Sequence, residues 1–140
     1  LETVSRVAPA LFTANASGRG VPAAQAVRVR NGTLTYFPVA QFDSTGNQFV
    51  PAEIDLGPAT DQVVLALYGS GVRRRSNLSA VRVTVGGVAL PADYASEAPG
   101  FTGLDQINVL LPRTLIGRGE VDVTVVVDGL TANTVRIRIK

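Results

Sequence analysis

Cysteine, histidine, methionine and tryptophan are all absent from the sequence, and its single lysine is Lys140. Without cysteine, the chain forms no disulfide and offers no thiolate as a nucleophile or metal ligand. Without histidine, it also lacks the commonest protein ligand of zinc, copper and haem iron. Soft metal sites are therefore excluded, and we expect neither a metal centre nor a cofactor.

The same absences remove the usual catalytic groups. Serine triads need a histidine base and thiol catalysis needs a cysteine, so neither can be assembled. A pair of carboxylates, as in glycosidases, stays open in principle, although nothing in the sequence brings two of them together. The acidic residues that such a pair would draw on are Glu2, Glu53, Asp55, Asp61, Glu97, Asp105 and Glu120. We therefore expect no enzymatic activity and no catalytic residues.

Long apolar runs and one-sided charge are missing too. No run approaches the ~20 residues of a membrane-spanning helix. The net charge of +2 comes from arginines interleaved with acidic residues, without a basic face rich in aromatic residues. We therefore expect neither membrane insertion nor a nucleic-acid partner. The chain starts at Leu1 without a methionine, and we expect it to be a processed product or a part of a longer protein.

What the sequence does contain is typical of β-structure. Valine, alanine, threonine and glycine dominate, whereas lysine and glutamate are scarce. Short segments separated by Gly, Pro and Asn turns at roughly 8 to 12 residues favour a sandwich or barrel. Besides the hairpins described next, we predict strands over residues 49–54, 63–68 and 106–111, and one helical turn over residues 112–116.

Asn31-Gly32 lies between alternating residues and predicts a hairpin with a two-residue type I′ turn. This turn sets Val29 opposite Leu34 and Val27 opposite Tyr36 on one face, with arginine and threonine on the other. Pattern and register therefore agree.

Gly86-Gly87 passes the same test. A two-residue loop there pairs Val85 with Val88 and Val83 with Leu90 on an apolar face, and leaves arginine and threonine facing water.

The last hairpin, which joins residues 121–127 to residues 135–139 around Asp128-Gly129, fails the test. A two-residue loop would set valine and isoleucine beside acidic side chains. We therefore predict a three-residue connection or a bulge, which moves Val135 opposite Val123.

Several segments resemble a family of C-terminal domains found in secreted, often multidomain proteins of soil Acidobacteria. They lie at residues 7–15 (VAPALFTAN), 67–71 (LYGSG), 85–88 (VGGV), 94–95 (YA), 99–101 (PGF), 103–109 (GLDQINV), 111–112 (LP), 129 (G) and 131–135 (TANTV). From about residue 60 the pattern is also similar to the immunoglobulin-like IPT/TIG module. The resemblance implies a secreted or cell-surface setting and an immunoglobulin-like fold. Members of the family usually carry a further sandwich before this region.

The expected fold is an all-β, immunoglobulin-like antiparallel β-sandwich with an N-terminal β-hairpin extension. A change in composition at residues 56–59 marks a seam. We therefore expect an N-terminal strand and hairpin region over residues 1–58, packed on an IPT/TIG-like sandwich over residues 59–140, the two together forming one compact unit.

Three polar segments are candidate sites. Residues 43–47 (DSTGN) carry oxygen ligands that calcium could use, although a polar hairpin turn explains them as well. Residues 73–75 (RRR) offer guanidinium groups to an anion such as sulfate, phosphate or an acidic sugar, or form a solvated loop. Gln106 and Asn108 share a strand face, and they either present amides to a sugar or a sheet partner or form a structural ladder. We expect most of the aromatic rings to pack in the core or the seam.

We predict a non-enzymatic extracellular structural or interaction module that assembles through strand edges into a filament or oligomer. The terminal segments, residues 1–7 and 135–140, are the strands expected to pair with another chain. The alternative is a carbohydrate-binding or targeting module of a secreted protein. Expected partners are accordingly a protein, either a second copy or a neighbouring domain, or else a glycan. The candidate interaction residues are Leu1, Val4, Val7, Arg73, Arg74, Arg75, Gln106 and Asn108.

Overall fold

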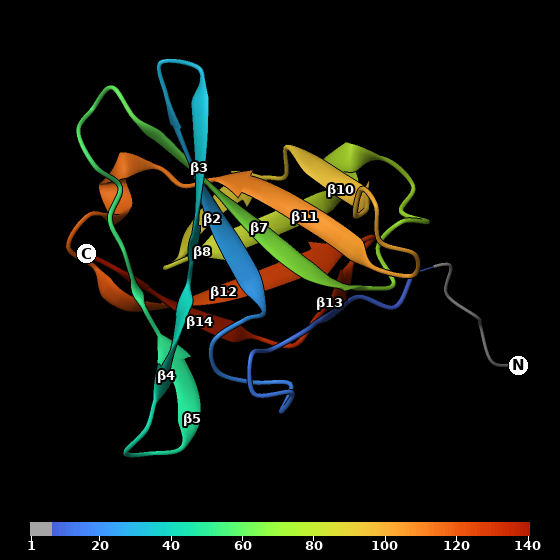
Figure 1. The fold of residues 1–140 in the computed structure, drawn as a ribbon. Coiled ribbons are helices and arrows are strands. Elements are labelled where there is room, and N and C mark those ends of the chain that lie inside the picture. The colour runs from blue at the N-terminus through green and yellow to red at the C-terminus, as the bar shows by residue number, and fades with distance from the viewer. Residues whose placement is uncertain (1–6) are drawn as a thin grey trace, which may run out of the picture.

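The protein is an all-β sandwich of two sheets, as a computed structural model that describes residues 7–140 shows (Figure 1). The strands are β1 (Ala10–Leu11), β2 (Ala24–Arg30), β3 (Thr33–Pro38), β4 (Ala40–Asp43), β5 (Gln48–Pro51), β6 (Glu53–Ile54), β7 (Gln62–Ser70), β8 (Val81–Val85), β9 (Val88–Pro91), β10 (Tyr94–Glu97), β11 (Asp105–Leu110), β12 (Gly119–Val127), β13 (Leu130–Thr131) and β14 (Val135–Ile139). Two single turns of 3₁₀-helix, η1 (Leu78–Ala80) and η2 (Arg113–Leu115), interrupt them, and η2 matches the helical turn predicted for residues 112–116.

The first sheet has the strand order β10-β11-β7-β2-β3, with β1 paired to the end of β7. The second has the order β6-β14-β12-β8-β9, with β13 paired to β12. All of these pairs are antiparallel except β6 with β14. The inner faces of both sheets contribute to one hydrophobic cluster, built largely of valine. The prediction of an all-β antiparallel sandwich is therefore confirmed.

Turn chemistry set the hairpin registers as predicted. At the first hairpin, Asn31 (φ 49°) and Gly32 (φ 77°) both occupy the left-handed region that a type I′ turn needs. Val29 lies opposite Leu34, and the ladder continues in the same register to the end of β2. At the Gly86-Gly87 hairpin the predicted pairs also form.

The C-terminal hairpin contains the predicted bulge. Val127 pairs with Leu130 across a two-residue turn, whereas further along Val123 pairs with Val135. One extra residue is therefore accommodated between β13 and β14. The bulge keeps the valines of both strands on the core side.

Four of the strands were not predicted: β1, β4, β10 and β13. The predicted strand over residues 49–54 is divided into β5, which forms a separate hairpin with β4, and β6, which joins the second sheet. The N-terminal region supplies β2 and β3 to the same sheet as β7, so residues 1–58 and 59–140 share one sheet.

The C-terminal segment is an interior strand. The prediction that residues 135–140 are free to pair with another chain was wrong, because β14 is bounded by β12 on one side and by β6 on the other. The backbone N–H of Arg136 also donates to the carbonyl of Gly20. Of the N-terminal segment, residues 1–6 lie outside the described residues, and Val7 is 2% exposed within the core.

β1 is fastened from both sides. Gly69 of β7 lies directly against it, where a Cβ atom on the glycine would come within 2.0 Å of the Ala10 carbonyl oxygen. On the opposite side, the Asn133 side chain accepts from the Leu11 N–H (2.7 Å) and donates to the Leu11 carbonyl (3.0 Å). The amide of Asn133 thus takes the place of a neighbouring strand.

Replacing Gly69 with alanine is expected to destabilise the domain by about 1–3 kcal/mol, because the added methyl group meets backbone that has to move. The free energy of unfolding in urea measures this. Gly46→Ala is the matched control, since its nearest neighbours are flexible side chains of Asp43 and Gln48. Equal effects of the two substitutions would contradict the close approach.

Candidate interaction surface

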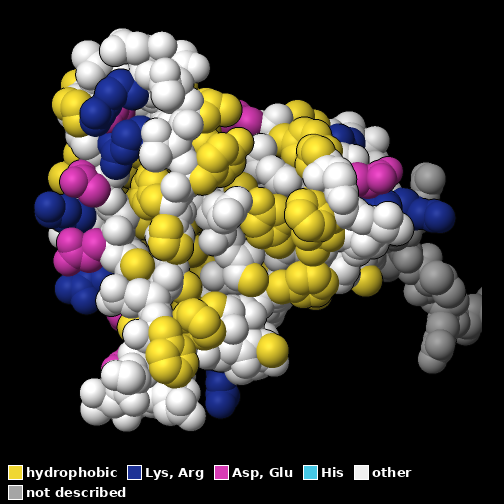
Figure 2. All heavy atoms as spheres, in the orientation of Figure 1, with side chains coloured by type: hydrophobic (Ala, Val, Ile, Leu, Met, Phe, Trp, Pro, Cys, Tyr) yellow, Lys and Arg dark blue, Asp and Glu magenta, His cyan; other side chains and the backbone are white. Residues whose placement is uncertain are grey.

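Among residues 7–140, the strands of the first sheet place no charged side chain on its outer face. On each of the five strands β10, β11, β7, β2 and β3, alternate residues point outward, while neighbours such as Ala26, Leu65 and Ile107 are buried. The outward residues are Gln25, Val27 and Val29 of β2, Leu34, Tyr36 and Pro38 of β3, Gln62, Val64, Ala66 and Tyr68 of β7, Tyr94 and Ser96 of β10, and Gln106, Asn108 and Leu110 of β11. Figure 2 shows this face with hydrophobic side chains spread across it.

The outer face of the second sheet is different. Arg136 pairs there with Asp122 (2.8 Å) and Glu120 (3.6 Å), and Arg138 pairs with Glu53 (3.7 Å). All of these side chains are substantially exposed. The two outer faces therefore differ in kind, one neutral and partly apolar and the other charged, and the neutral face is the better candidate for binding.

The neutral face has a polar and an apolar part. In the polar part, the Tyr68 hydroxyl donates to the Gln25 side-chain oxygen (3.2 Å), and the Gln106 amide donates to the Asn108 side chain (2.8 Å). Burial, together with the nearby Tyr36, raises the pKa of Tyr68. Gln106 and Asn108 share a face as predicted, and their amides bond to each other.

A shallow groove of about 420 Å³ borders this polar part. Its lining residues are Ala23, Ala24, Gln25, Tyr68, Phe101 and Leu104. The Phe101 ring is 64% exposed beside it. Exposure of this ring, and likewise of Phe12, Tyr36, Phe42 and Phe49, contradicts the expectation that most aromatic rings are buried.

Two of the three arginines at residues 73–75 have structural partners. The buried Asp105 carboxylate accepts from the backbone N–H of Val72 (2.8 Å) and from Arg73 Nε (2.7 Å). Arg75 Nε donates to the carbonyl of Ala95 (2.6 Å). Arg74 is exposed and lines a small pocket with Arg73 and Asp105. The arginine run therefore organises a loop, and Arg74 is the most exposed of its three residues.

The loop at residues 44–47 connects β4 to β5, which is the polar hairpin turn considered above. The Asp43 carboxylate accepts from the Thr45 N–H (3.0 Å), a local bond that shapes the turn. Among residues 7–140, no three acidic side chains gather where they could hold a metal ion. Phe42 and Phe49 form an exposed edge-to-face pair on this hairpin, with ring centroids 5.3 Å apart.

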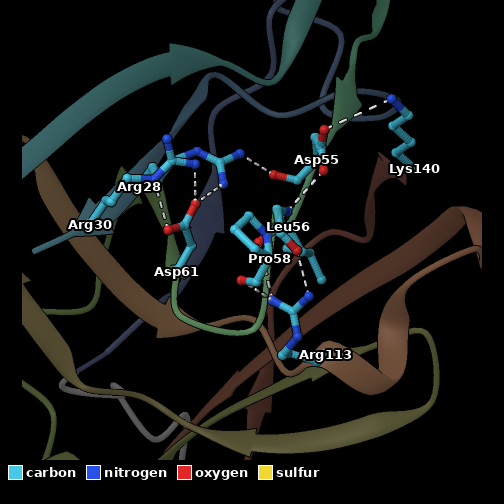
Figure 3. A network of polar contacts seen from close by, with 9 residues as sticks. Arg28, Arg30, Asp55, Leu56, Pro58, Asp61, Arg113 and Lys140 are labelled. Carbon is cyan, nitrogen blue, oxygen red and sulfur yellow. Dashed lines mark hydrogen bonds and ion pairs between the residues drawn. The ribbon is translucent and has the colours of Figure 1, made fainter.

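A buried carboxylate holds the β2–β3 hairpin against the body (Figure 3). Asp61 has no accessible side-chain surface, and it accepts from Arg28 Nη1 (2.8 Å), Arg30 Nε (2.9 Å) and Arg30 Nη2 (2.6 Å). Arg28 also donates to the Asp55 carbonyl. Arg113 fixes the intervening loop by donating to the carbonyls of Leu56, Gly57 and Pro58. The arginine face of the hairpin therefore points inward.

The ion pairs of Asp61 with Arg28 and Arg30, here called the Asp61 clamp, should make the free energy of unfolding depend on pH. Hydrogen bonds from Arg30, and further ones from Arg28, lower the pKa of Asp61 to about 2 from its ordinary 3.8. Because the folded-state pKa is the lower one, the stabilisation is complete above about pH 4 and is lost as the pH falls toward 2. Asp61→Asn should lower the urea midpoint strongly at pH 7, and its difference from the unmodified chain should shrink between pH 4 and pH 2.

Asp122→Asn is the control for this measurement, because the Asp122 carboxylate pairs with Arg136 on the exposed face. Exposed ion pairs contribute only about 0–1 kcal/mol. If both variants lost the same stability at pH 7, the Asp61 clamp would not have the structural role assigned to it.

Comparison with known proteins identifies no relative. No family model matches the chain, and no significant match was found among curated proteins or solved structures. Within the described part of the chain, no helix is long and apolar enough to cross a membrane.

Of the predicted interaction residues, the structure brings Gln106 and Asn108 together on the neutral face. It places Arg73 and Arg75 in structural bonds and buries Val7. Leu1 and Val4 lie outside the described residues. Sequence reasoning missed the outward valines of β2 and the tyrosines beside them, because an apolar hairpin face is ordinarily taken for the core side.

Proposed function

We propose that this domain is a non-enzymatic, extracellular structural or interaction module that associates with further copies of itself through the first sheet. The observation that carries the proposal is the neutral outer face, which spans five strands without a charge and contains Leu34 (53% exposed) and Tyr36 (60% exposed). An apolar surface of this kind gains free energy when a partner covers it.

A second copy is the partner that suits this face best. Burying a charge without a counter-charge is costly, so a neutral face favours a partner whose contact surface is also neutral. The same face on a second copy of the chain is also neutral, so it is such a partner. The extracellular setting and the immunoglobulin-like arrangement are supported by the resemblance of the sequence.

Light scattering over a concentration series tests self-association. The mass of the unmodified chain should rise above 14.6 kDa, whereas Val27→Lys, which adds a charge to the apolar part of the neutral face beside Tyr36, should keep the chain monomeric. Val126→Lys is the matched control, because Val126 is also a half-buried outward valine but belongs to β12 in the second sheet. A monomer at every concentration, or equal losses in both variants, would refute the proposal.

A second candidate function is binding of a neutral carbohydrate at the groove beside Phe101. An exposed ring next to neutral amide and hydroxyl groups suits a sugar, which offers an apolar ring face and hydroxyl groups. Calorimetric titration with neutral oligosaccharides tests it. Phe101→Ala should weaken binding about tenfold, since an aromatic contact contributes about 0.5–1.5 kcal/mol. Phe42→Ala, which removes an exposed ring from the β4–β5 hairpin, should have no effect, and equal binding by all three proteins would exclude the groove.

A further inference from the structure

Among residues 7–140, and apart from the separate β4–β5 hairpin and the two-residue strands β1 and β13, the sheets end in four edge strands: β10 and β3 in the first sheet and β6 and β9 in the second. An unprotected edge strand offers unpaired N–H and C=O groups to another chain, and soluble proteins usually block such edges. Comparing the four edges shows which one is available for pairing.

The β10 edge is blocked by side chains. Ala98 N–H donates to the Leu104 carbonyl, and with the register of β10 on β11 this turns the backbone groups of Ala95 and Glu97 toward the open side. The carbonyl of Ala95 accepts from Arg75 Nε, and that of Glu97 accepts from the Tyr94 hydroxyl. Both acceptors at this edge are therefore occupied.

Within the described part of the chain, the second sheet has no long free edge either. With the two-residue Gly86-Gly87 turn, the backbone N–H and C=O groups of Val88 and Leu90 bond to β8. Only the backbone groups of Ala89 and Pro91 therefore point to the open side of β9. Pro91 has no N–H to donate. β6 spans only Glu53–Ile54, and the next carbonyl, that of Asp55, accepts from Arg28.

β3 differs from these three strands. Its type I′ turn makes Arg30 and Thr33 a pair that exchanges both hydrogen bonds, so the backbone groups of Leu34 and Tyr36 point away from β2. In the part of the chain that the structure describes, no hydrogen bond is made to those groups. Five of the six residues of β3 are exposed.

The chemistry of β3 suits pairing with its own copy. When a strand pairs antiparallel with an identical strand about a two-fold axis, a charged residue near the axis meets the same charge, which is repulsive. β3 contains no charged residue. β14, in contrast, carries Arg136 and Arg138. Pro38, which cannot donate, ends the run of usable donors in β3 and limits pairing to residues 33–37.

We infer that β3 pairs antiparallel with β3 of a second copy, with the two-fold axis passing beside Thr35. This inference rests on the proposed self-association through the first sheet and assigns the contact to the edge of that sheet. Leu34 of one copy lies opposite Tyr36 of the other, and each such pair exchanges two backbone hydrogen bonds. On the outward face these are aliphatic–aromatic cross-strand pairs, and on the other face Thr35 meets Thr35, a favourable combination.

The resulting assembly is a closed pair. A contact of the same strand with itself is isologous and is used up once two chains have met. Growth into a filament would need a second free edge, and β10, the opposite edge of the same sheet, is capped by Arg75 and Tyr94. The structure therefore favours a dimer over the filament that the sequence left open.

Single-cysteine variants test the register, and the absence of native cysteine keeps the readout clean. In the proposed dimer, Thr35 and its copy form a non-hydrogen-bonded pair with Cα atoms about 4.5 Å apart, which a disulfide can span. Thr35→Cys should therefore oxidise to a covalent species of twice 14.6 kDa, more than about tenfold faster than Thr45→Cys in the exposed β4–β5 loop. Thr33→Cys alone should not, because Thr33 faces Phe37 of the other copy.

Amide hydrogen exchange provides a readout without substitution. The N–H groups of Leu34 and Tyr36 should exchange more slowly as the concentration of the unmodified chain rises, while that of Ala89 on β9 should not change. Cross-linking of Thr35→Cys no faster than Thr45→Cys, or preferential self-linking of Thr33→Cys, would overturn the inference. Association that is sensitive to Val27→Lys without linking at Thr35 would leave the proposed function standing and refute the edge pairing alone.

Discussion

The arrangement of the first sheet depends on one buried carboxylate. Asp61 has no contact with solvent and takes hydrogen bonds from Arg28 and Arg30, the two arginines of β2. To reach it, the hairpin must present its arginine face to the body, and its apolar face is thereby left outside. The two ion pairs of Asp61 thus stabilise the orientation opposite to the one that burial of the hairpin's valines alone would favour. The exposed Leu34 and Tyr36 and the neutral face are consequences of that orientation.

Sequence reasoning succeeded where the determining forces are local. Asn31-Gly32 sets the register of its hairpin through the backbone conformation of two adjacent residues, and the acidic residues of β12 pointed to the bulge before β14. It failed where a partner lies far away in the chain. Nothing near Arg28 announces Asp61, which is 33 residues later, and the alternation of β2 is equally consistent with either face pointing inward. The orientation of the hairpin, and with it the candidate site, was for that reason not predictable.

The arginine run at residues 73–75 illustrates the same limit. In sequence it resembles an anion site, because three guanidinium groups are adjacent. In the fold, Arg73 satisfies the buried Asp105 and Arg75 caps the carbonyl of Ala95, so the run is divided between a loop and a sheet edge. The sequence showed that the segment is positively charged, but it did not show that two of the arginines bind groups of the protein itself. Because Arg75 occupies the Ala95 carbonyl at the β10 edge, the two edges of the first sheet differ: β10 is protected and β3 is exposed.

The contacts on both sides of β1 have a consequence for how the domain would respond to a pulling force. Tension entering near Val7 would reach β1 first, and β1 is held by β7 on one side and by the Asn133 amide on the other. The load would pass directly into β7, the central strand of the sheet, and into the loop that precedes β14. β3 does not lie on this path, because β2 separates it from β7. A pulled domain would therefore keep the pairing of β2 with β3 until the contacts of β1 were broken.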